Sequence, residues 1–200
     1  RDRVWVGTQN GLYSIDGDHV DQLTENDGLV HPQVGALLAD ADGDLWYGTG
    51  GFASAGNGAG RYIADELRSF TVADGLKTDE VMSLGNDAEG RLWAGTWDGV
   101  SILEGDRFRD LPGLTSNTWE ILLARDSAMW VGTSQSGLHR CVAEVCEELG
   151  TATTTRLFED ATGDIWASTS TSLSPTLRVS NDAVTRYPER IHLVSNQGNA

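Results

Sequence analysis

Basic residues are scarce in this sequence of 200 residues. Lys and Arg together number 14 against 30 Asp and Glu, which gives a formal net charge of −16. A protein that binds nucleic acid needs clustered Lys and Arg to displace counterions from phosphates, and the basic residues here stand singly. The charge therefore argues against nucleic acid and against an anionic membrane surface as partners.

Long hydrophobic runs are also missing. No apolar run reaches the roughly 18 to 20 residues that a membrane span requires. Arg1-Asp2-Arg3 leads directly into a strand-like segment, without a recognisable signal peptide. We therefore expect no direct membrane insertion, and a mature form or an excised part of a larger protein.

Motifs that carry chemistry are equally sparse. The histidines share no spacing, and they are His19, His31, His139 and His192. No nucleophile elbow and no phosphate-binding glycine loop occurs in its strand-to-helix context. The sequence thus predicts no catalytic residue, no metal site and no cofactor, and it favours a binding protein over an enzyme.

What the sequence does contain is a repeat centred on tryptophan. Trp5, Trp46, Trp93, Trp130 and Trp166 follow one another at separations of 41, 47, 37 and 36 residues, each inside a segment such as Leu-Trp-Ala-Gly-Thr. A period of about 40 residues is typical of one four-stranded blade of a β-propeller. Apolar runs broken by Gly, Asp and Asn predict strands throughout, and no stretch shows sustained helical periodicity.

Each repeat divides into four strands, which we name A to D. Strand B carries the tryptophan, strand A precedes it through an acidic turn, and strands C and D form the hairpin that follows. We expect an all-β fold, a single β-propeller domain over residues 1–200 with five four-stranded antiparallel blades. The repeat units begin near Arg3, Asp44, Arg91, Ala128 and Asp164.

Closure of the ring depends on the last residues. Unit one begins at strand B, and Ile191 to Asn196 resembles a further strand A. We expect this C-terminal strand to complete the N-terminal blade and to hide its edge. Consecutive blades of a larger ring, or two associated chains, remain alternatives. A closed ring predicts a monomer, and incomplete blades predict a homo-oligomer.

The recurring residues have a structural and a functional interpretation. The tryptophan in each repeat is either an aromatic binding platform or a large residue that fills the space between blades, and its constant register favours the second. The turns Asp40 to Asp44, Asp87 to Arg91 and Asp160 to Asp164 are rich in carboxylates. Their spacing differs from that of a calcium-binding loop, which favours structural turns.

The two cysteines fall at matched positions of one hairpin. Alignment of unit four on unit one places Cys141 at Ile15 and Cys146 at Val20, which face each other between strands C and D. We expect a disulfide, which suits a periplasmic or extracellular location. A pair of buried free thiols is the alternative.

One family resembles this repeat. The segments that carry the resemblance are Phe70 to Leu76, Val81 to Leu84, Asp87 to Thr96 and Asp98 to Val100. They resemble the two-component regulator propeller repeat of the periplasmic sensor regions of hybrid histidine kinases. The resemblance implies a sensory input or recognition module. Streptogramin lyases are propellers with related repeats that use a metal with His and Glu, so a metal-dependent lyase is a lesser alternative.

Candidate binding residues lie where the repeats differ. In a propeller, the B–C turns and the D–A connections emerge on one face, which we name the loop face. Trp97 is the most informative, because none of its equivalents in the other repeats is a large core residue. These equivalents are Gln9, Gly50, Gln135 and Thr171. The candidates are Gln9, Asn10, Trp97, Asp98 and Gln135 from the turns, and His31, Lys77 and Asn117 from the connections.

An exposed aromatic beside amides and a carboxylate suits a saccharide-like small ligand, with a protein partner on the same face as the alternative. Two alternatives remain. Trp97 could cap its own blade, or the chain could be a structural or engineered scaffold that only self-associates.

Overall fold

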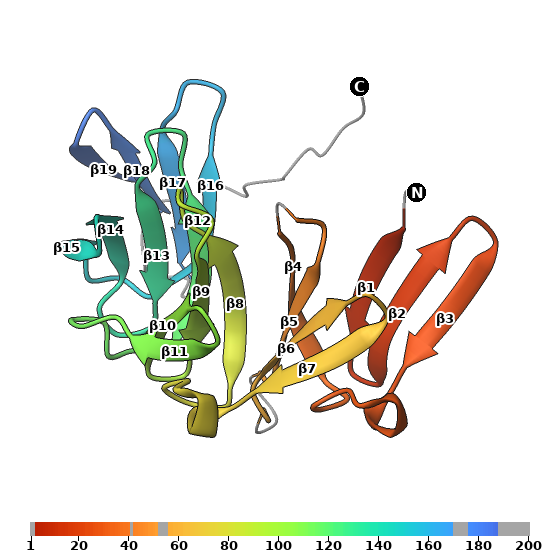
Figure 1. The fold of residues 1–200 in the computed structure, drawn as a ribbon. Helices are drawn as coiled ribbons and strands as arrows, with labels where there is room; N and C mark the ends of the chain where they lie inside the picture. Colours follow the sequence, from red (N-terminus) through yellow and green to blue (C-terminus); the bar gives the residue numbers. More distant parts are fainter. Residues whose placement is uncertain (1–2, 41, 52–55, 170–175, 188–200) are drawn as a thin grey trace.

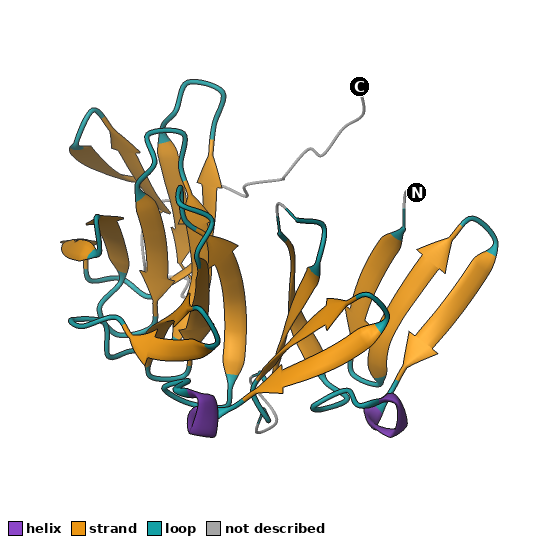
Figure 2. Cartoon of the chain, viewed as in Figure 1, coloured by secondary structure: helices purple, strands orange, loops and turns teal. Residues whose placement is uncertain are grey.

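The computed structural model describes residues 3–40, 42–51, 56–169 and 176–187 of the chain. Its regular elements are strands, apart from two short 3-10 turns, η1 (Glu25–Asp27) and η2 (Val72–Asp74), drawn in purple in Figure 2. Across this part of the chain, helices of the length and hydrophobicity that a bilayer crossing requires do not occur.

The strands are grouped below by blade, in chain order. Blade one holds β1 (Val4–Thr8), β2 (Gly11–Asp16) and β3 (His19–Leu23); blade two holds β4 (Val34–Ala39), β5 (Leu45–Thr49), β6 (Ala59–Ile63) and β7 (Glu66–Phe70). Blade three holds β8 (Val81–Asn86), β9 (Leu92–Thr96), β10 (Gly99–Glu104) and β11 (Arg107–Asp110). Blade four holds β12 (Thr118–Leu123), β13 (Met129–Thr133), β14 (Leu138–Val142) and β15 (Val145–Gly150). Blade five holds β16 (Thr154–Glu159), β17 (Ile165–Thr169), β18 (Thr176–Ser180) and β19 (Ala183–Tyr187).

Every blade is an antiparallel meander whose strands pair in chain order. Consecutive blades pack side by side, with β1 against β4, β4 against β8, β8 against β12 and β12 against β16. In Figure 1 the red and orange blade one lies at one end of this series and the blue blade five at the other. The predicted propeller with five blades is therefore confirmed.

Blade one has three strands among the described residues, as expected of a unit that begins at strand B. The segment predicted to supply its strand A, Ile191 to Asn196, lies outside the described residues, so ring closure stays a prediction. The free face of blade one is apolar. Val4 is 55% exposed and Val6 is 38% exposed, whereas the equivalent Leu45 and Tyr47 of blade two are 5% and 0% exposed.

The recurring tryptophan fills the space between blades. Trp93 is 1% exposed and belongs to a cluster that joins blade three to Ile121 and Val131 of blade four. Gly95, two residues later, is needed for this approach, because a Cβ there would lie 2.7 Å from Cγ2 of Thr118 in the next blade. The interpretation of the tryptophan as a packing residue is confirmed.

A second role of the repeat was not predicted. In blade three, Nε1 of Trp93 donates to Oδ2 of Asp87 at 2.9 Å. Oδ1 of the same carboxylate accepts the backbone N–H groups of Glu89 and Arg91 at 3.1 and 2.8 Å. The equivalent bonds from tryptophan to aspartate are Trp46 to Asp40 at 3.1 Å and Trp166 to Asp160 at 2.8 Å. The acidic turns thus satisfy backbone and indole donors, which supports their structural interpretation.

The predicted disulfide is present. Cys141 and Cys146 are opposite each other on β14 and β15, and their sulfur atoms are 2.06 Å apart. The two residues of the connecting turn, Ala143 and Glu144, both have positive φ, which is the two-residue hairpin geometry that fixes this register.

Candidate functional site

The loop face forms as predicted. Backbone hydrogen bonds join the B–C turn of a blade to the connection that leads into the same blade. They run from Gly50 N to Gln33 O at 3.3 Å and from Trp97 N to Glu80 O at 3.1 Å. In blade four, Ser134 N donates to Asn117 O at 3.0 Å. The two sets of loops therefore meet on one face, and backbone geometry fixes their relative positions.

The Asp-Gly-Leu segments of the connections shape this face. In η2 the backbone N–H of Thr71 donates to Oδ2 of Asp74 at 2.9 Å, and Leu76 is buried. Gly75 has φ 95, and a Cβ there would lie 2.1 Å from the carbonyl oxygen of Phe108. In η1 the equivalent bond from the backbone of Thr24 lowers the pKa of Asp27. These residues hold the loops in place and are not themselves free for a ligand.

Trp97 projects from the B–C turn of blade three. Oγ1 of Thr96 donates to the carbonyl oxygen of Gly99 at 3.0 Å and accepts the N–H of Asp98 at 3.3 Å. Gly99 has φ 118, which permits the tight turn. Trp97 is 44% exposed, and Asp98 is exposed beside it. The turn thus holds an indole and a carboxylate in solvent.

Lys77 forms hydrogen bonds between neighbouring connections of the loop face. Its backbone N–H donates to Oγ of Ser101 at 3.0 Å, and its Nζ donates to the carbonyl oxygen of Leu114 at 3.2 Å. Both partners are buried, and Lys77 itself is half-buried. The lysine links the connection before blade three to the one before blade four.

Asn117 and Gln135 lie on the next blade. The carbonyl oxygen of Asn117 accepts from Ser134, and the backbone N–H of Gln135 donates to Oγ of Ser116 at 2.9 Å. Gln135 is exposed and Asn117 is half-buried. We use the name blade-three sector for five candidates. They are Lys77, Trp97 and Asp98 of blade three and its connection, together with Asn117 and Gln135 of the adjacent blade four.

The other three candidates belong to the first two blades. Gln9 and Asn10 are exposed on blade one, where the carbonyl oxygen of Asn10 accepts from Nε2 of Gln22 at 2.8 Å. Nδ1 of His31, in the connection to blade two, accepts the backbone N–H of Gln33 at 3.2 Å. Blade two separates them from blade three, so they form a second group on the same face.

Trp119 also lies on this face, although it is not among the predicted binding residues. The pairing of β12 with β13 shifts between Thr118 and Glu120, so Trp119 stands at a bulge. Its Nε1 donates to Oγ of Ser134 at 2.8 Å, beside the turn that carries Gln135. The equivalent bulges hold Gly35, Met82 and Thr155. The comparison between repeats that singled out Trp97 could also have singled out Trp119.

The chemistry of the sector suits recognition of a neutral polar molecule. An exposed indole can stack on an apolar ring face, while amide and carboxylate groups take hydrogen bonds from hydroxyls. Across the residues that the structure describes, no group of three His, Cys, Asp or Glu is arranged to hold a metal ion. The geometry of the sector therefore offers contacts for a polar ligand.

Comparison with known families finds one match. The model of the family described as two component regulator propeller matches residues 75–98, which lie in blade three and the connection before it. This stretch runs from Gly75 through the Trp93 segment to Asp98, and it confirms the resemblance seen in the sequence. No curated protein matches the chain.

Several solved structures share the fold. Virginiamycin B lyase from Staphylococcus aureus aligns with a TM-score of 0.73 and 18% identity, over 92% of this chain and 66% of the lyase. The extracellular domain of a putative hybrid two component system from B. thetaiotaomicron aligns with a TM-score of 0.67 and 16% identity, over 99% of this chain and 33% of that one. PorZ, a surface component of the type-IX secretion system of Porphyromonas gingivalis, aligns with a TM-score of 0.67 and 15% identity, over 93% of this chain and 32% of PorZ. The chain thus spans just under two thirds of the lyase and about one third of the other two.

Proposed function

We propose that this chain is an extracellular sensory propeller that recognises a saccharide-like small ligand through the blade-three sector. The family match in blade three and the likeness to the extracellular domains of hybrid two component systems support the sensory role. The observation that carries the ligand class is Trp97, a large aromatic residue 44% exposed on a rigid turn.

The exposure of Trp97 needs an explanation because three of the tryptophans that define the repeat are almost fully buried. Trp46, Trp93 and Trp130 are 1% to 3% exposed. Leaving a large indole in water forgoes stabilisation of about 2 kcal/mol from burial. A ligand that stacks on Trp97 would recover part of this free energy, and the amide of Gln135 and the carboxylate of Asp98 would supply direction.

The disulfide agrees with an extracellular location. Cys141 and Cys146 are bonded in blade four, and disulfides persist mainly outside the reducing cytosol. This chemistry is in keeping with the extracellular domains among the structural neighbours.

The likeness to a lyase concerns the fold alone and does not support an enzymatic role for this chain. The described histidines stand apart: His19 contacts Asp21, Nδ1 of His31 accepts a backbone N–H, and His139 is buried in β14. His192 lies outside the described residues. A propeller can carry either a lyase site or a binding site, so the function of this chain depends on the residues of its loop face.

A glycan array followed by calorimetry tests the proposal. The wild-type chain should retain one class of glycan, and Trp97→Ala should weaken binding of the selected glycan by at least about fivefold, since stacking on an aromatic ring contributes roughly 1 kcal/mol or more. Trp97→Tyr should retain most of the affinity because it keeps an aromatic face.

Gln9→Ala is the matched control, since Gln9 occupies the equivalent turn position on blade one and lies outside the sector. An array that retains no glycan, or equal binding by wild type and Trp97→Ala, would contradict a saccharide ligand. If the chain captured a protein instead of a glycan, the loop face would be a site for a protein partner. Thermal unfolding of each variant checks that the exposed side chain contributes little to stability.

A further inference from the structure

Blades two and five carry two acids in the turn between strands A and B, and these acids bind two donors. In blade five, Nε1 of Trp166 donates to Oδ2 of Asp160 at 2.8 Å, and Nε of Arg178 donates to Oδ2 of Asp164 at 2.9 Å. The matching residues of blade two are Asp40, Asp44, Trp46 and Arg61. Each acid therefore has its own donor.

Blade four keeps both donors and lacks both acids. Trp130 and Arg140 are paired opposite each other on β13 and β14, as Trp166 and Arg178 are on β17 and β18. Ala124 and Ala128 stand at the positions of the two acids. Trp130 is 3% exposed, and its Nε1 has no hydrogen-bond partner among the described residues. A buried donor in this state costs free energy, which an added acceptor would recover.

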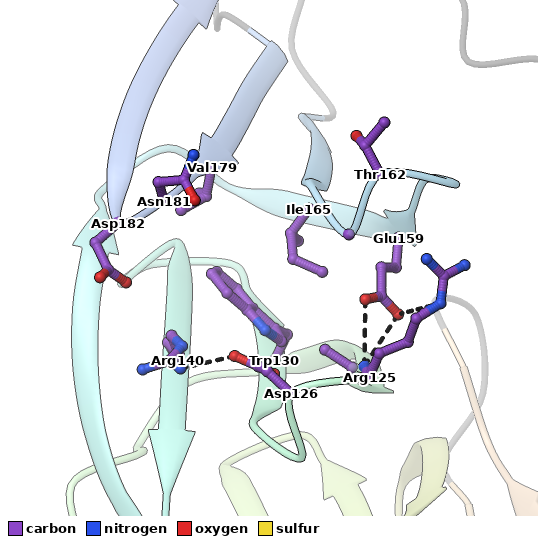
Figure 3. A pocket seen from close by; sticks show the side chains of 12 residues that line it. Arg125, Asp126, Trp130, Arg140, Glu159, Thr162, Ile165, Val179, Asn181 and Asp182 are labelled. Carbon is purple, nitrogen blue, oxygen red and sulfur yellow. Dashed lines mark hydrogen bonds and ion pairs between the residues drawn. The ribbon is translucent and has the colours of Figure 1, made fainter.

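A surface cleft lies at this position. It has a volume of about 430 Å³ and lies between blades four and five, beside the turns that join strands A and B. These turns stand at the strand ends opposite the loop face. Ala124 and Trp130 line it from blade four, and Ile165 and Val179 supply apolar surface from blade five. Figure 3 shows Trp130 with Ile165 on one side and the pair of Arg140 and Asp126 on the other.

Two arginines and three acids line the cleft. Nη2 of Arg140 donates to Oδ2 of Asp126 at 2.7 Å, and the two side chains are 30% and 50% exposed, so the pair can move. The carboxylate of Glu159 accepts the backbone N–H of Arg125 at 3.1 and 3.2 Å and lies 3.9 Å from its guanidinium. Asp182 is exposed at the rim. Asp126 and Glu159 are therefore each paired with an arginine.

We propose that this cleft is a second ligand site, which binds a small organic acid whose carboxylate takes the place of the two missing aspartates. One oxygen accepts from Nε1 of Trp130, and Arg140 turns from Asp126 to the same carboxylate. Hydrogen bonds to an ionised acceptor are about twice as strong as neutral ones. The apolar part of the acid packs on Ile165 and Val179. This site is independent of Trp97.

Acetate is the probe, and the indole N–H resonances of the full chain in a ¹H–¹⁵N spectrum are the readout. Trp130→Phe identifies the Trp130 resonance by its loss. Replacing chloride by acetate at constant ionic strength, up to about 0.1 M, should shift that resonance along a saturable curve and leave the resonance of Trp97 unchanged. A neutral analogue, acetamide, should bind at least about tenfold more weakly.

Two variants decide the origin of the shift. Ala124→Asp should move the Trp130 resonance in the absence of acetate and abolish its response, because the carboxylate is then internal. Arg140→Met should weaken acetate binding by about tenfold and keeps the proposal testable if Ala124→Asp does not fold. A Trp130 resonance that acetate does not move, or that moves equally in wild type and Ala124→Asp, would overturn the proposal.

Discussion

Asp87 joins the turn of blade three to its core through Trp93. The carboxylate accepts the indole N–H at 2.9 Å, and the side chain is only 4% exposed. Nε of Arg91 donates to the same oxygen at 2.8 Å. Arg91 also contacts Glu144 of blade four at 2.6 Å, so the network connects two blades. One acid thus fixes a turn, the position of a core tryptophan and an interblade ion pair.

Asp87→Ala should therefore destabilise the chain strongly. It leaves the indole of Trp93 without a partner in the core and removes the acceptor of two backbone N–H groups. Loss of such a buried network costs about 3 kcal/mol, measured as the free energy of unfolding in urea. Asp87→Asn should lie between wild type and alanine, since it keeps one acceptor oxygen.

Asp106→Ala is the control. Asp106 forms an ion pair with Arg68 at 2.7 Å, but its side chain is 78% exposed. Such a pair contributes less than about 1 kcal/mol. If both alanine variants unfolded at the same urea concentration as wild type, the proposed role of Asp87 would be wrong.

The bond between Asp87 and Trp93 shows how far the sequence could predict the fold. The period of the tryptophans predicted the blades, because each repeat must bury the same large residue at the same interface. The acids were predicted only as turn residues. Their bond to the indole depends on how far the turn folds back over strand B, which neither spacing nor composition reveals.

The candidate site was predicted in part for a similar reason. Differences between aligned turns identified Trp97, which is exposed as expected. Trp119 was missed because a bulge in β12 changes the direction of its side chain, and alternation along a strand does not reveal a bulge. The cleft beside Trp130 was missed because it arises from two alanines whose importance appears only when the partner of each tryptophan is known.

Reduction of the disulfide should lower stability moderately. Cys141 is 2% exposed and packs in the cluster of blades three and four, while the bond closes a loop with a sequence separation of 5. A loop this short predicts a contribution of about 2 kcal/mol. Urea unfolding with and without reductant measures it.

The variant Cys141→Ala/Cys146→Ala separates the bond from the reductant, since reductant should not change its stability. Iodoacetamide added to the unreduced, unfolded wild type should label neither cysteine. Labelling of both would contradict the bond, and the buried-thiol alternative would then apply.

His139 should make blade four sensitive to acid. It is 5% exposed on β14, and its Nε2 has no partner among the described residues. Burial lowers the pKa of His139 below its usual 6.5, although Glu148, opposite it on β15, acts in the other direction. The unfolded chain therefore binds a proton more readily than the folded chain. Stability is complete above the unfolded pKa and falls as the pH decreases from there towards the folded pKa.

The comparison of wild type with His139→Gln isolates this contribution from the many carboxylates. The free energy of unfolding of the wild type, relative to the variant, should decrease between about pH 8 and about pH 5.5, the range in which histidine titrates. The carboxylates change both proteins alike, because they titrate mainly at lower pH. A difference between the two proteins that stays constant over this range would mean that His139 has the same pKa in the folded and the unfolded chain, which would contradict the effect of burial in β14.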